Sequence, residues 1–71
     1  DVNEIDVDRS ILFSIEYILY SCPNIFKKEK IYTKVIVLID KCLNKKNIGL
    51  DYEYNAKEIK SDIQKIYKKE E

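Results

Sequence analysis

Glycine and proline each occur once in this chain of 71 residues, and that scarcity limits the possible folds more than any other feature. Sheets joined by tight hairpins need several residues that accept a positive φ, and one glycine cannot supply them. We therefore expect a mainly helical chain. A hydrophobic fraction of 45% is typical of a globular protein. We predict a single small helical domain over residues 1–71, near the lower size limit for an independent core.

The stretch KIYTKVIVLIDKCLN, residues 30–44, is the segment that also fits a buried strand, because five apolar residues follow one another within it. Helical spacing gathers its apolar residues into one arc of about 160°, with Val37 as the exception. A strand does not explain why the apolar period continues past Asp40 to Cys42 and Leu43. The length and the period together favour a helix.

Three helices are predicted, at residues 8–21, 24–46 and 55–69. Pro23 cannot continue the first helix, but its fixed φ suits the first turn of the second, so the corner between them is tight. Lysines and asparagines followed by Gly49 are a stop signal for the second helix. Since short corners favour antiparallel neighbours, we predict an all-α, three-helix antiparallel bundle.

Side chains that accept hydrogen bonds from free backbone N–H groups predict where two of the helices begin. Asp6 or Asp8 is expected to cap the first helix. Asn55 and Glu58 have the spacing of a capping box, with which the third helix would begin.

The first predicted helix has two apolar faces. Its main face is aliphatic and consists of Ile11, Leu12, Ile15, Ile18, Leu19 and Cys22. Phe13, Tyr17 and Tyr20 form an aromatic face at positions i, i+4 and i+7, which is the anchor pattern of a helix that binds in a groove. Two interpretations stay open: a partner covers this face, or the third helix and the tyrosines of the connector before it do.

From the aromatic face we predict a protein–protein interaction module or a small subunit of a larger assembly. Aromatic side chains are over-represented among the residues that dominate binding energy in interfaces. The expected contact residues are Phe13, Tyr17 and Tyr20, together with Val37 as an exposed apolar residue. The partner would be another protein or a second copy of the chain.

Lysines suggest nucleic-acid binding as the alternative function. Residues 25–50 carry a net charge of +5 and residues 1–24 carry −4, although the whole chain is neutral. A helix-turn-helix-like domain would use lysines of the second and third helices, namely Lys27, Lys30, Lys34, Lys41, Lys57 and Lys60. The connector is longer than that motif needs. Lysine also outnumbers arginine twelve to one, as AT-rich genomes favour, so a solvated lysine face is the simpler interpretation.

Familiar enzyme chemistry is excluded by the residues that the chain lacks. It has no histidine for acid–base catalysis or zinc binding, and one glycine cannot form a phosphate-binding loop. The acidic start, DVNEIDVD, has neither the Gly nor the Glu that a calcium loop needs at its sixth and twelfth positions. We predict a protein without enzymatic activity, metal or cofactor. The longest apolar run, of five residues, also predicts no membrane-spanning helix.

The two cysteines, Cys22 and Cys42, are predicted to remain free thiols. A helix between them would separate them by about 30 Å, whereas a disulfide needs Cα atoms within about 7 Å. Free thiols favour an intracellular location. Cys22 also precedes Pro23 at a helix start, where the dipole favours a reactive thiolate, but a small buried apolar residue is the favoured interpretation.

Overall fold

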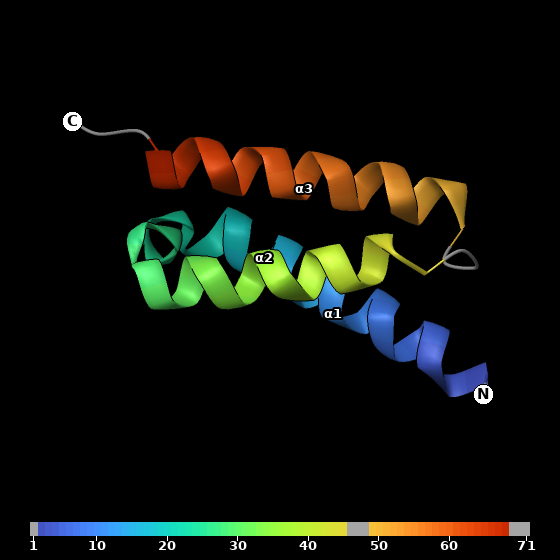
Figure 1. The fold of residues 1–71 in the computed structure, drawn as a ribbon. Coiled ribbons are helices and arrows are strands. Elements are labelled where there is room, and N and C mark those ends of the chain that lie inside the picture. The colour runs from blue at the N-terminus through green and yellow to red at the C-terminus, as the bar shows by residue number, and fades with distance from the viewer. Residues whose placement is uncertain (1, 46–48, 69–71) are drawn as a thin grey trace.

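The computed structural model describes the backbone of residues 2–45 and 49–68, with side chains from residue 7 onward. Helix α1 spans Val2–Ser21, α2 spans Glu29–Leu43 and α3 spans Leu50–Lys68, while a short 3-10 helix, η1, covers Pro23–Lys27 between the first two. Successive α-helices run in opposite directions, and α3 lies along the other two (Figure 1). The described residues contain no strand, so the predicted all-α, three-helix antiparallel bundle is confirmed.

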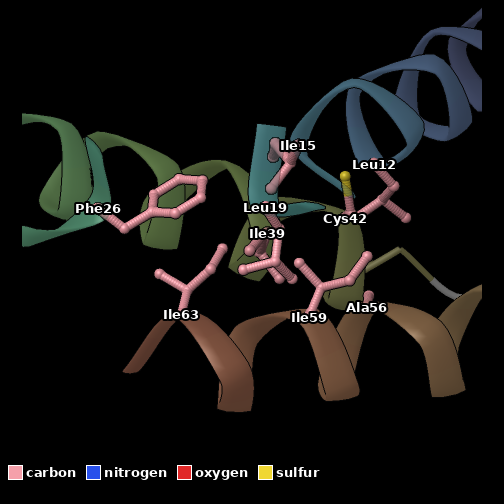
Figure 2. Close-up of a cluster of buried hydrophobic side chains, with 9 residues drawn as sticks. All are labelled: Leu12, Ile15, Leu19, Phe26, Ile39, Cys42, Ala56, Ile59 and Ile63. Atoms are coloured by element: carbon pink, nitrogen blue, oxygen red, sulfur yellow. The ribbon is translucent and has the colours of Figure 1, made fainter. Parts of the chain in front are cut away.

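One cluster of buried apolar side chains holds the three helices and η1 together. Figure 2 shows these side chains converging from all four elements. Its members are Leu12, Ile15, Leu19, Phe26, Ile39, Cys42, Ala56, Ile59 and Ile63. Each large aliphatic or aromatic side chain in such a cluster contributes about 1.5–3 kcal/mol through burial. Their spacing along α1, α2 and α3 follows the helical period that the sequence predicted.

Helix α1 begins earlier than the sequence predicted. The helix starts at Val2 rather than at residue 8, so Asp6 and Asp8 lie within it and neither is an N-cap. Acidic residues are favoured by the helix dipole throughout the first turn as well as at the cap, and the pattern therefore did not fix the boundary. Asp8 is buried instead, with its Oδ2 atom 3.0 Å from the Nζ atom of Lys45.

The predicted second helix, 24–46, is divided and ends sooner. Pro23 opens η1, and the backbone becomes extended at Lys28 (φ −79°, ψ 123°) before α2 begins at Glu29. This break directs Phe26 into the core, where burial of its ring offsets the lost helical hydrogen bonds. Helix α2 ends at Leu43, where the backbone N–H of Asn44 donates to the carbonyl of Asp40. The predicted end at residue 46 lies outside the described residues.

Helix α3 begins five residues before the predicted start. Gly49 has a φ of +104°, and its carbonyl accepts the first helical hydrogen bond, from the N–H of Glu53 at 2.9 Å. The glycine that was expected to stop one helix therefore begins the next. Asn55 lies inside α3, and Glu58 accepts a hydrogen bond from the hydroxyl of Tyr54 at 3.3 Å, so the predicted capping box is wrong. The predicted end at residue 69 lies outside the described residues.

Candidate interaction surface

The aromatic residues of α1 are largely exposed. Tyr17 is 73% exposed, Tyr20 77% and Phe13 51%. Phe13 makes an edge-to-face contact with the ring of Tyr52 on α3, with ring centroids 5.6 Å apart. The third helix therefore covers part of Phe13, as one of the two interpretations required, but the rings of Tyr17 and Tyr20 remain open to solvent.

Tyr52 fixes the side of α1 that faces α3. The guanidinium of Arg9 lies over the Tyr52 ring, 4.4 Å from its centroid. Such cation–π contacts are worth about 0.5–1 kcal/mol where they are exposed. Since the same ring also meets Phe13, the start of α3 is held against the middle of α1. Phe13 is consequently covered in part by α3 and exposed to solvent in part.

A shallow groove of about 560 Å³ lies between α1 and α2. Its lining combines six apolar residues with two serines: Val7, Ser10, Ile11, Ser14, Ile15, Ile18, Val35 and Leu38. Three of the apolar ones leave much of their area in solvent, since Val7 is 54% exposed and Ile18 and Leu38 are each 37% exposed. Among the described residues, none of those lining the groove is charged. The groove is an apolar surface that the fold leaves uncovered.

Tyr17 borders this groove. Ser10, Ser14 and Tyr17 follow one another at positions i, i+4 and i+7, so they form one exposed stripe along α1. Phe13 and Tyr20, seven residues apart, share the neighbouring stripe on the side of α3. The predicted aromatic face is thus divided: Tyr17 belongs to the groove edge, whereas the other two rings lie further round the helix.

The spacing of apolar residues along the sequence did not predict the groove. Ile11 and Ile18 were assigned to the main buried face of α1, but Ile18 is exposed and Ile11 is only half-buried. The signal was present in the spacing of Val7, Ile11 and Ile18 at i, i+4 and i+11, which widens the apolar arc beyond what one neighbouring helix covers. Residues 10 and 14, small and polar, keep the groove shallow and accessible.

Val37 is separated from the aromatic residues. It is 48% exposed, as predicted, but it does not line the groove. Its neighbour Leu38 does, and consecutive residues point about 100° apart around a helix, which places Val37 on the outward side of α2. The structure therefore does not bring Val37 together with Phe13, Tyr17 and Tyr20.

The six candidate lysines fall into two groups. On η1 and α2, the exposed ones are Lys27, Lys30, Lys34 and Lys41. On α3, Lys57 pairs with Glu53 at 3.1 Å and Lys60 pairs with Asp40 at 2.7 Å. The second pair joins α3 to α2, so Lys60 has a structural partner.

Two exposed lysines border the groove. Lys34 and Lys41 precede and follow Leu38 by four and three residues, so they are its neighbours on the surface of α2. The groove therefore has a basic rim on α2, and on α1 the serines Ser10 and Ser14 line it, with Tyr17 next to Ser14 on the same stripe.

Cys22 and Cys42 are free, as predicted. Cys22 is exposed, which makes its interpretation as a small buried apolar residue wrong: α1 ends at Ser21, and the chain turns away before the apolar face reaches it. Cys42 is buried, with its Sγ 3.9 Å from the carbonyl of Asp8. Burial raises the pKa of the Cys42 thiol and the Asp8 carboxylate raises it further, while Lys45 opposes them.

Within the part of the chain that the structure describes, no group of three or more cysteine or acidic side chains is placed to hold a metal ion. Nor is any described helix both long and apolar enough to span a membrane. The chain matches no protein-family model, and neither a curated protein nor a solved structure shows significant similarity to it.

Proposed function

We propose that this chain is a non-enzymatic protein-interaction domain that binds its partner through the exposed face of α1. The observation that supports this proposal is the Tyr17 ring, 73% exposed next to an apolar groove, with the Tyr20 ring, 77% exposed, further round the same helix. Tyrosine combines a large apolar ring with a hydroxyl, and such residues are enriched at the centres of protein interfaces. The fold itself covers little of this face, so most of its area would be buried only by contact with a second protein.

Binding and folding should respond differently to substitutions at these tyrosines. Because Tyr17 and Tyr20 lie outside the core, replacing either by alanine should change the free energy of unfolding by about 0.5 kcal/mol or less. Truncating an aromatic residue at the centre of an interface typically costs about 2 kcal/mol or more of binding energy. Loss of binding without loss of stability is the expected signature.

Photocrosslinking of the full chain in the cells that make it tests the proposal. A benzophenone amino acid replaces Tyr17 in one variant and Tyr54, which is 64% exposed on α3, in a matched control. The expected result is a discrete protein adduct from position 17 that position 54 does not give. Equal adduct patterns at the two positions, or none at either, would contradict an interaction face on α1.

Nucleic-acid binding is the second candidate, and the observation that favours it is the exposure of Lys27, Lys30, Lys34 and Lys41. The ion pairs of the two α3 lysines weigh against α3 as a reading helix. Binding through lysine contacts to phosphates would weaken steeply with salt, with a slope of about −0.9 per phosphate neutralised on duplex DNA. A titration of labelled duplex and single strands at two salt concentrations decides this, since absent or salt-independent binding excludes it.

A further inference from the structure

We propose that the occupant of the groove between α1 and α2 is a second copy of this chain, paired through α1 about a two-fold axis near Ser14. This inference rests on the proposed function, because it names the partner for the same face. A two-fold pair needs a surface that is complementary to itself. The face of α1 between Val7 and Ser21 meets that requirement in shape and in side-chain size, and the distribution of charge along the sequence favours one orientation of the pair.

The same face of α1 carries both an exposed aromatic ring and an apolar hollow. Tyr17 is 73% exposed on α1, and it lies three residues after Ser14 and one before Ile18, which both line the groove. In an antiparallel pair centred on Ser14, position 17 of one copy lies level with position 11 of the other. Ile11 lines the groove, so each Tyr17 ring would meet the hollow of the opposite copy. Both contacts form at once, because the symmetry repeats them.

The side-chain sizes favour the same centre. Helices approach to about 8–10 Å depending on the side chains at the contact. Ser10 and Ser14 are small and exposed, and they lie one turn apart beside the groove. Ser14 lies one helical turn from both Ser10 and Ile18, which also line the groove. A crossing at Ser14 therefore brings the two helices close and leaves the larger side chains on either side.

Charge selects the antiparallel orientation. Residues 1–24 carry a net charge of −4, and three of their five acidic residues precede Asp8, which is buried and already paired with Lys45 of its own chain. A parallel pair would place these two acidic ends side by side. The antiparallel pair instead brings each acidic end to the far end of the other α1, next to exposed lysines of η1 and the first turns of α2: Lys27, Lys28, Lys30 and Lys34. Opposite charges then face each other twice.

The size of the face sets the expected affinity. A standard stable interface buries about 800 Å² on each partner, which is about 15% of the 5264 Å² surface of this chain. The stretch from Val7 to Ser21 is about 21 Å long, at 1.5 Å per residue, and one helix face of that length falls short of this area. Interfaces below about 1,200 Å² in total are typically weak, so we expect a dissociation constant in the micromolar range or above.

Sedimentation equilibrium of the reduced chain, over a range of concentrations, measures the pairing. We expect a reversible equilibrium between the 8.5 kDa monomer and a species of twice that mass. Tyr17→Ala should weaken it by about 30-fold or more, as truncation of a central aromatic residue does. The matched control is Tyr54→Ala, which removes a similarly exposed ring from α3 and should leave the equilibrium unchanged. A chain that stays monomeric to millimolar concentration, or equal effects of the two substitutions, overturns the proposal.

Engineered disulfides test the geometry. In a Cys22→Ser background, Ser14→Cys should form a covalent dimer under mild oxidation, because the axis places position 14 opposite itself. Ser21→Cys should do so poorly with itself but efficiently when mixed with Val7→Cys, since positions 7 and 21 lie level in the antiparallel pair. Efficient self-linking at all three positions would mean parallel helices and would overturn the orientation.

The two proposals fail separately. Photocrosslinks from position 17 to other proteins, combined with a monomer in the centrifuge, would refute self-pairing and support the interaction face. Adducts of dimer mass, together with the Tyr17-dependent equilibrium, support both. Absence of adducts and of dimers would refute both.

Discussion

At the scale of single residues, the fold acts most strongly on Cys42. Its thiol is buried in the core beside the backbone carbonyl of Asp8, and the side-chain carboxylate of the same residue is paired with Lys45. Burial raises the pKa of the Cys42 thiol above its ordinary value of 9.0, with Asp8 adding to the shift and Lys45 opposing it. The folded chain therefore holds the thiol proton at a pH where the unfolded chain has begun to release it.

The raised pKa of the Cys42 thiol makes the free energy of unfolding depend on pH. From the ordinary pKa of 9.0 upward the folded state binds more protons than the unfolded state, so the free energy of unfolding falls as pH rises. Below that pH this contribution is fully present, and it is lost as pH rises through the folded pKa. Urea unfolding between about pH 8 and 10.5 should show this decline in the parent chain. In Cys42→Ala the chain is less stable throughout, but its decline should be shallower; parallel curves would contradict the assignment.

At the scale of the elements, Gly49 decides where α3 begins. Its φ of +104° is a conformation that residues with a Cβ atom rarely adopt. A Cβ atom there would lie 3.5 Å from the guanidinium of Arg9, an ordinary contact, so the backbone and not crowding sets the cost. Gly49→Ala should destabilise the chain by about 1–3 kcal/mol.

Asn44→Ala is the matched control for this prediction. Asn44 lies in the same connector but has a φ of −77°, which alanine adopts without strain. Its replacement should change the free energy of unfolding by about 0.5 kcal/mol or less. The midpoints of urea unfolding compare the two variants, and similar midpoints would show that the connector relaxes around a side chain at position 49.

The helices themselves and the end of α1 at Ser21 could be predicted from the sequence, but the starts of the three helices and the end of α2 could not. The helical spacing of apolar residues predicted all three helices, because the residues that repeat along each helix also line the core. The ends depend on tertiary contacts: the break at Lys28 accompanies the burial of Phe26 in the core, which no local pattern indicates. A glycine can follow the end of one helix or precede the start of the next. The sequence alone therefore did not show which of these roles Gly49 has.

The candidate surface was predictable in part for the same reason. Spacing along one helix was enough to identify Tyr17 and Tyr20 as a second face, and both rings are exposed. The groove needs two helices, since Ile18 of α1 and Leu38 of α2 meet across it. Which side of α1 its neighbours leave uncovered depends on how the bundle packs, and helical period does not contain that information.

At the scale of the whole molecule, charge is segregated along a neutral chain, and in the proposed dimer this segregation would act between the two copies. The chain has net charge 0, yet its first 24 residues carry −4 and the next 26 carry +5. Attraction between such segments on different copies acts through solvent and is screened by salt, with a Debye length of about 30 Å at 0.01 M and about 3 Å at 1 M. Pairing should therefore be tighter at low ionic strength.

The measurement is the association constant by sedimentation equilibrium at about 0.02 M and about 0.5 M NaCl, where screening changes from weak to nearly complete. We expect several-fold weaker pairing at the higher salt concentration. Lys30→Glu combined with Lys34→Glu should weaken pairing at low salt and remove or reverse its salt dependence, because the acidic end of the other copy then meets like charge. Lys65→Glu together with Lys68→Glu, which makes the same change in net charge on the last turn of α3, is the control. If both double variants behave alike, net charge and not the segment on α2 governs pairing, and the charge argument for antiparallel helices fails.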